Sequence, residues 1–317
     1  KLQFRDVDAF IHPDHRHRTD VRYIKKTLDT KLSHDDFVEF AEYIRSSGCI
    51  PMATPFDEAS VDLCVELGFP ILKLASSDLN DWVLIEKMGA TRLPVIASTG
   101  GSSLKDIDDL VTFFENRSIP LAVNHCVSLY PSEDGELELN QIDFLRNRYP
   151  GVTIGYSTHE YHDWHSSVML AYAKGARTFE RHIDIEADDI SVSPYCSLPH
   201  QVDEWFRSWH KAQEMCGGSM TEKRQPPIRE IEYLDALVRG VYAKRDLPAG
   251  HRLAEDDIFL AVPLLKGQLS CRELIAGEEL AHGVSAKAPI TIDALDNPYS
   301  RNYELRNHIL NRGLDPE

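Results

Sequence analysis

The chain has 317 residues, of which 42% are hydrophobic, and its formal net charge is −17 at neutral pH. It contains no apolar run long enough to cross a bilayer, which argues against a membrane-spanning protein. The negative charge repels polyanions and argues against nucleic acid as a partner.

The six cysteines are scattered, and none forms a CxxC pair with another. This usage predicts reduced thiols in the cytoplasm rather than a zinc ribbon or a disulfide scaffold. The sequence begins at Lys1 with neither an initiator Met nor a signal-peptide pattern, so we expect it to be trimmed at its start.

The first two thirds of the chain alternate short apolar runs with amphipathic stretches. Helices are expected at 33–47, with Ser33 as the N-cap, and at 103–116. Strands are expected at 1–4, 50–56, 71–76, 94–99, 121–126, 153–158 and 178–184. Strands that alternate with helices predict a parallel sheet.

Seven such strands are one short of a (β/α)8 TIM barrel. We place the missing first strand before Lys1 and expect a Glu or similar group at its end to complete the site. A doubly wound open sheet is the competing architecture, but no GxGxxG loop follows any strand. Nearly every strand ends in Thr, Ser, Lys or His, as expected when all loops contribute to one site at the carboxyl face of a barrel.

The composition changes after the barrel. A polar linker that contains Pro226-Pro227 leads to short strands and turns, with 247–250 as an expected hairpin turn. A weak repeat relates 240–244 to 283–287. The expected domains are a barrel at 1–218, a linker at 219–236, a small all-β β-clip module at 237–296 and a charged tail at 297–317, either a surface helix or partly disordered.

Two strand ends carry the strongest chemical signal. Ser157 and His159 alternate at one end, and Glu180 and His182 alternate at the next, so each pair lies on one face of its strand. Neighbouring parallel strands lie about 5 Å apart, so both imidazoles could reach one ion. The alternative is that each is a hydrogen-bonded structural histidine. A third cluster, His12, His15 and His17, is interpreted as a solvated loop.

Other strand ends carry groups suited to a phosphorylated carboxylate. Burying an unpaired lysine in an apolar strand costs free energy, so Lys73 is a functional candidate. The turn that begins at Ser98 offers free backbone N–H groups. The remaining candidates of this kind are Lys1, Gln3, Thr54 and Ser76, and ordinary loop capping is the alternative for the hydroxyl residues.

Six motifs occur in one order and spacing: ATPF (53–56), LKLASSDL (72–79), IASTGG (96–101), NHCVSLYP (124–131), GYSTHEY (155–161) and ERHID (180–184). With them the chain resembles the sialic acid synthase family, including its spore coat polysaccharide synthases. The module after the barrel resembles the antifreeze-like (SAF) β-clip domain of that family. The resemblance covers residues 1–295.

The resemblance implies a cytoplasmic homodimer that condenses phosphoenolpyruvate with a hexosamine-type aldose and releases phosphate and a nine-carbon 2-keto-3-deoxy acid. It implies a divalent metal, Mn foremost, with Fe, Co, Mg or Zn as alternatives. Its phosphoenolpyruvate pocket falls on Lys1, Thr54, Lys73, Ser76 and Ser157, its metal ligands on His159 and His182, its sugar-side positions on Gln3, Tyr130 and Glu180, and an acidic position on Asp78.

The chain departs from the family pattern at three positions. Ser193 stands where the family has a sugar-binding Asp, Ser128 where it has Asn, and Val262 where its β-clip domain has an Arg that contacts the N-acyl group in a partner subunit. These departures predict an aldose other than N-acetylmannosamine. The rival hypotheses are a metal-dependent barrel aldolase acting on a sugar phosphate and a non-catalytic carbohydrate-binding relative.

Overall fold

The computed structural model describes residues 1–187, 191–218, 221–273 and 277–315. The chain divides into two compact units, Lys1–Gly218 and Ser219–Glu317. The expected linker begins at 219 and 220, which lie outside the described residues. Among the helices that the structure describes, none combines the length and the apolar character needed to cross a bilayer.

The first unit is built on a parallel sheet of seven strands in the described residues, ordered as in the sequence. The strands are β1 (Leu2–Phe4), β2 (Met52–Pro55), β3 (Ile71–Leu74), β4 (Val95–Ser98), β5 (Leu121–Cys126), β6 (Thr153–Thr158) and β7 (Thr178–Arg181). Each lies within an apolar run that was expected to be a strand, which confirms the β/α barrel class.

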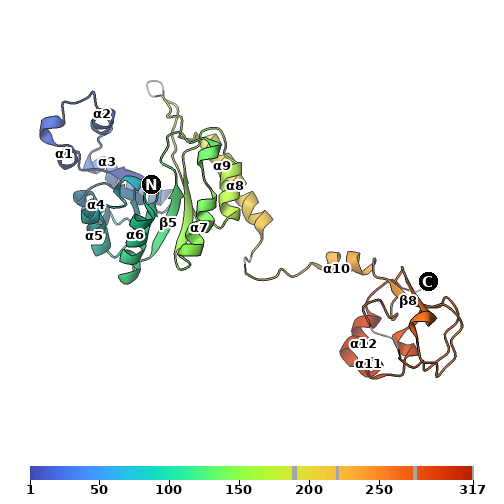
Figure 1. Cartoon of the computed structure of the whole chain (residues 1–317). Coiled ribbons are helices and arrows are strands. Elements are labelled where there is room, and N and C mark those ends of the chain that lie inside the picture. The colour runs from blue at the N-terminus through green and yellow to red at the C-terminus, as the bar shows by residue number, and fades with distance from the viewer. Residues whose placement is uncertain (188–190, 219–220, 274–276, 316–317) are drawn as a thin grey trace. The chain divides into compact units, whose positions relative to one another are not determined.

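Helices cover the outer face of the curled sheet (Figure 1). They are α3 (His34–Ser46), α4 (Glu58–Glu66), α5 (Trp82–Ala90), α6 (Leu104–Asn116), α7 (Asn140–Arg148), α8 (Ser166–Ala173) and α9 (Pro199–Cys216), preceded by the short α1 (Val7–Phe10) and α2 (Arg22–Asp29). Ser33 caps α3 as the sequence predicts, and Ser103 caps α6, each through a capping box. The interface is apolar, with Leu74, Ile85 and Phe114 fully buried.

The sheet is curled but not closed. Its edges are β1 and β7, which are not paired with each other in the described residues. The side chains of Lys1 and Glu180 nevertheless meet across this opening, with Nζ 2.9 Å from Oε1. The architecture is therefore a TIM-like barrel in which the carboxyl ends of all seven strands face one side.

The second unit contains α10 (Ile228–Asp235), β8 (Gly240–Ala243), β9 (Ile258–Ala261), α11 (Pro298–Arg301) and α12 (Tyr303–Leu310). β8 and β9 form an antiparallel pair. The expected turn at 247–250 is present, since the His251 N–H donates to the Pro248 carbonyl oxygen. It does not close a hairpin, because the flanking Leu247 and Arg252 bridge to Val284 and Glu279 rather than to each other. The sequence repeat is visible in space, since Ala243 exchanges backbone hydrogen bonds with Lys287 and Ala288.

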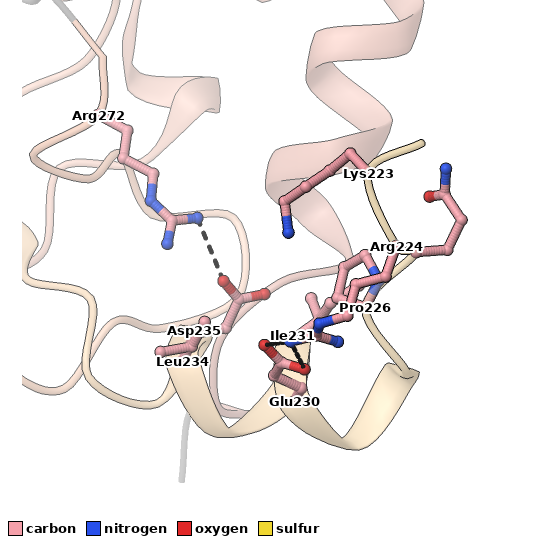
Figure 2. A pocket seen from close by; sticks show the side chains of 9 residues that line it. Lys223, Arg224, Pro226, Glu230, Ile231, Leu234, Asp235 and Arg272 are labelled. Carbon is pink, nitrogen blue, oxygen red and sulfur yellow. Dashed lines mark hydrogen bonds and ion pairs between the residues drawn. The ribbon is translucent and has the colours of Figure 1, made fainter. Parts of the chain in front are cut away.

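Two segments of this unit are more ordered than expected. The segment expected as a tail packs into the module, with Ile309 buried in its core and Arg312 bonded to Glu273. The segment expected as a linker forms α10, which lines a shallow pocket (Figure 2). The acidic groups of this pocket, Glu230 and Asp235, pair with Arg224 and Arg272, so they serve to hold the helix in place.

Candidate functional site

The two candidate metal-binding histidines lie side by side at the ends of neighbouring strands. His159 follows β6 and His182 follows β7, and their ring centroids are 5.3 Å apart. The Nδ1 of His159 lies 2.8 Å from the carbonyl oxygen of Val127, so Nδ1 carries the proton and Nε2 keeps its lone pair. The structure thus brings together the pair that the sequence predicted.

Burial favours the neutral form of both imidazoles. Burial lowers the pKa of His159, whose residue exposure is 3%. Burial, with further repulsion from His159 and Lys1, lowers the pKa of His182 to about 4. A neutral imidazole is the form that binds a metal.

Two tyrosine rings lie beside the histidine pair. The Tyr130 ring lies 4.0 Å from that of His159, and the Tyr195 ring lies 5.3 Å from that of His182, measured between centroids. The two tyrosine rings are 5.1 Å apart. Tyr130 was predicted as a site residue, whereas Tyr195 was not among the predicted positions. Tyr195 could have been found from its place in the loop 193–197, which follows β7 and His182.

A buried charge cluster adjoins the histidines. Lys73 is 1% exposed and donates from Nζ to the Leu74 carbonyl oxygen over 2.6 Å. Burial and the neighbouring Lys1 lower the pKa of Lys73 to about 8, while the charge of Glu180 opposes the shift. Burial alone would raise the pKa of Glu180, but Lys73 and Lys1 outweigh it and hold this pKa at about 2. The Lys1 ammonium therefore pairs directly with the Glu180 carboxylate, and the Lys73 ammonium acts on the same carboxylate through its charge.

Several predicted polar groups have unused hydrogen-bonding capacity. Thr54 Oγ1, Ser98 Oγ and Asp78 Oδ2 are buried and have no hydrogen-bond partner within the part of the chain that the structure describes. Burial also raises the pKa of Asp78. Buried polar atoms without partners are rare in folded proteins, so such a group near a charge cluster indicates a ligand site.

The strand-to-helix turn after β4 is packed tightly against this region. The Ser76 hydroxyl accepts a hydrogen bond from the Gly100 N–H over 3.0 Å. A Cβ added to Gly100 would overlap the Ser128 hydroxyl and crowd Ser76. The turn therefore requires glycine at position 100, which lets the ends of β3, β4 and β5 come close together.

The remaining predicted site residues make fewer contacts with the charge cluster of Lys1, Lys73 and Glu180. Ser157 is buried and lies in register with Glu180 on the next strand. Gln3 is exposed and accepts a hydrogen bond from Arg5. Ser193 is half-buried, and its carbonyl accepts a hydrogen bond from the N–H of Cys196 in the loop that runs beside His182.

Sequence reasoning missed a buried ion pair behind the histidines. Arg181 and Glu160 approach to 2.9 Å, and their side chains are 2% and 0% exposed. Each residue is the chain neighbour of one histidine. The sequence does show that Glu160 and Arg181 are charged residues at the ends of apolar strands. It does not show that their side chains meet.

The donor set is compatible with a divalent metal. Two neutral imidazoles supply nitrogen ligands, and positions would remain for oxygen ligands from substrate or water. No group of three or more His, Cys, Asp or Glu side chains that could hold an ion is found in the described residues. The His12, His15 and His17 side chains lie on exposed residues, as expected for a solvated loop.

Comparison with known proteins gives a consistent result for both units. The model of the NeuB family matches residues 1–221, and the model of the SAF domain matches residues 238–296. The N-acetylneuraminate-9-phosphate synthase of Drosophila melanogaster is 26% identical over 294 residues, which cover 84% of this chain and 77% of that protein.

Two further relatives extend the comparison. The N,N'-diacetyllegionaminic acid synthase of Legionella pneumophila is 26% identical over 265 residues, which cover 81% of this chain and 72% of that protein. The crystal structure of a spore coat polysaccharide biosynthesis protein E from Chromobacterium violaceum superposes with a TM-score of 0.89 at 36% identity, covering 93% of this chain and 88% of that one.

Proposed function

This chain belongs to the NeuB family, and we propose that it is a phosphoenolpyruvate-dependent sugar acid synthase. It condenses phosphoenolpyruvate with a hexosamine-type aldose to give a nine-carbon 2-keto-3-deoxy acid and phosphate, for a surface polysaccharide. Support comes from relatives that are named as synthases of N-acetylneuraminate 9-phosphate and of N,N'-diacetyllegionaminic acid. The homodimer stays a prediction.

The observation that carries the proposal is the charge cluster beside the histidine pair. Lys1 forms an ion pair with Glu180, whereas the buried Lys73 ammonium interacts with Glu180 and Asp78 only through its charge, so the positive charge of Lys73 has no ion-pair partner within the described residues. A bound anion would compensate that charge. The unpartnered hydroxyls of Thr54 and Ser98 would donate to its oxygen atoms.

The protein's own residues would then hold both substrates. Lys73 and Lys1 bind the carboxylate and phosphate of phosphoenolpyruvate, and Glu180 orients the two ammonium groups. The tyrosine rings beside the histidines would line the space in which the substrates react. A divalent ion, Mn foremost and Fe, Co, Mg or Zn as alternatives, would be held by His159 and His182 and would polarise the aldehyde carbonyl.

The reaction balances with water as the one further reactant. C3 of phosphoenolpyruvate forms a bond to the aldehyde carbon, and the aldehyde oxygen becomes a hydroxyl. Water adds at C2, and the C2–O bond to phosphate then breaks to leave the 2-keto group. Asp78 is the candidate for moving a proton in these steps, because burial raises its pKa.

A phosphate-release assay tests the proposal. We would incubate the metal-stripped protein with phosphoenolpyruvate and Mn²⁺ across a panel of free hexosamines, and omit the aldose as the control. The proposal expects phosphate release that depends on both the aldose and the metal. In a parallel incubation with sugar phosphates and no phosphoenolpyruvate, cleavage would indicate the aldolase alternative. Calorimetric binding of an aldose that gives no phosphate release would indicate a non-catalytic relative.

Phosphoenolpyruvate binding should weaken at alkaline pH. Lys73 binds an anion only when protonated, and its pKa in the free protein is about 8. The dissociation constant, measured without metal, should therefore be flat near neutral pH and rise about tenfold per pH unit well above pH 8. In Lys73→Arg the guanidinium stays charged, so the rise should disappear. A wild-type constant that does not change up to about pH 10 would contradict the role of Lys73.

Ser193→Asp should shift the sugar preference toward N-acetylmannosamine. A serine at this position lacks the carboxylate that would accept hydrogen bonds from sugar hydroxyls, and a charged hydrogen bond contributes about 1.5 to 3 kcal/mol, or roughly ten- to a hundred-fold. Competitive turnover measures the change, with Ser193→Asn as an uncharged control. We expect wild-type protein to prefer another hexosamine, and adding Val262→Arg should strengthen the shift. N-acetylmannosamine as the best wild-type substrate would refute this reasoning.

A further inference from the structure

The buried Arg181–Glu160 ion pair joins the two strand ends that carry the candidate metal ligands. Glu160 directly follows His159, and Arg181 directly precedes His182. Arg181 Nη1 lies 2.9 Å from Glu160 Oε1, and Nη2 donates to the Glu160 carbonyl oxygen over 2.6 Å. The guanidinium therefore holds both the side chain and the backbone of its partner.

The same guanidinium also fixes the loop after the second histidine. Arg181 Nε donates to the Ser197 hydroxyl, which also accepts from Trp164 Nε1 at 2.9 Å. The Ser197 N–H in turn donates to the His182 carbonyl oxygen at 2.9 Å. Arg181 thus links three backbone segments around the histidine pair, at His159–Glu160, Arg181–His182 and Ser197.

These two charged residues point away from the ion that the histidines would bind. Side chains alternate along a strand, so Glu160 and Arg181 face the helical layer when His159 and His182 face the barrel interior. The contact between the Ser167 hydroxyl on α8 and Glu160 Oε1 is consistent with that direction. Neither residue can be a ligand for the same ion, and each can act only through the backbone.

Stability alone is a poor explanation for this pair. The loss of hydration of two buried charges offsets most of their attraction, and apolar residues of similar volume often replace such a pair without loss of stability. What an apolar pair cannot reproduce is the set of directional hydrogen bonds to Glu160 and Ser197. We therefore expect Arg181 and Glu160 to determine the geometry of the two strand ends rather than the stability of the fold.

We propose that Glu160 and Arg181 are positioning residues that hold His159 and His182 at the separation needed to bind one divalent ion. This inference rests on the proposed function, because it assumes that the histidine pair binds a metal. It predicts that loss of the ion pair weakens metal binding more than it weakens binding of phosphoenolpyruvate, whose proposed ligands Lys1 and Lys73 do not touch this network.

The test is calorimetric titration of the metal-stripped protein with Mn²⁺ and, separately, with phosphoenolpyruvate. Glu160→Gln and Arg181→Lys should each bind Mn²⁺ about 10- to 100-fold more weakly, the range typical of residues that orient metal ligands. Their affinity for phosphoenolpyruvate should stay close to that of the wild type. The matched control is Asp108→Asn, which removes a bidentate ion pair with Arg148 between α6 and α7 and should leave both affinities unchanged.

A double variant separates positioning from stability. Glu160→Gln combined with Arg181→Met leaves no unpaired buried charge, so the melting temperature of the double variant should recover toward that of the wild type. The double variant therefore also provides a folded protein if a single variant does not fold. Its Mn²⁺ affinity should stay low. Recovery of Mn²⁺ affinity together with stability, or equal weakening of both ligands in the single variants, would overturn the inference. Absence of Mn²⁺ binding by wild-type protein would instead refute the metal centre of the proposed function, and this inference with it.

Discussion

Replacing His159 with alanine is expected to remove most of the bound divalent metal and to reduce turnover by about 10²- to 10³-fold, because several kcal/mol of carbonyl polarisation are lost. The remaining imidazole of His182 would hold an ion only weakly. Metal content by mass spectrometry and phosphate release at saturating substrates measure the two effects. His182→Ala should behave in the same way.

The matched control for this prediction is His15→Ala. This histidine lies on an exposed residue, and its ring is 5.4 Å from that of His12, so it belongs to the alternative place for an ion. Its replacement should leave the metal content and the turnover unchanged. If instead His15→Ala lost the metal and His159→Ala kept it, the metal centre would have to be moved to that loop.

Lys73→Met is expected to weaken phosphoenolpyruvate binding by roughly 10- to 100-fold, the usual effect of removing a charged hydrogen-bond donor. Methionine keeps most of the volume of the buried side chain, but it removes one of the two ammonium groups that compensate Glu180. The dissociation constant without metal is the quantity to measure, since it isolates anion binding from the later steps.

Lys87→Met serves as the control for Lys73→Met. The Lys87 ammonium lies 2.6 Å from Asp62, and both side chains are solvent-accessible, so this pair contributes little to stability or to any site. Its replacement should not change the dissociation constant. Wild-type affinity in Lys73→Met would show that the anion binds elsewhere.

Much of the barrel could be predicted because its signals are local. Apolar runs mark buried parallel strands, and Ser33 and Ser103 begin helices through capping boxes that lie within four residues of sequence. The histidine pair was also predictable, since strand alternation and the adjacency of successive parallel strands place His159 and His182 together.

The features that were missed depend on tertiary partners. The sequence shows Glu160 and Arg181 as two isolated charges, and only the tertiary structure brings them together as a buried pair. Leu247 and Arg252 flank a turn-like sequence, yet they pair with a segment far along the chain. In the same way, α10 lies in a segment expected to be a linker, and its Asp235 pairs with Arg272, which is distant in the sequence.

The central claim is carbon–carbon bond formation between phosphoenolpyruvate and an aldose, and isotope tracing tests it most directly. Phosphoenolpyruvate labelled with ¹³C at C3 would be incubated with the protein, Mn²⁺ and the aldose that gives the fastest phosphate release. The account predicts that the labelled carbon becomes bonded to the former aldehyde carbon in a nine-carbon 2-keto acid, with one phosphate released per product. Labelled pyruvate as the only product, or recovery of all the labelled phosphoenolpyruvate, would contradict it.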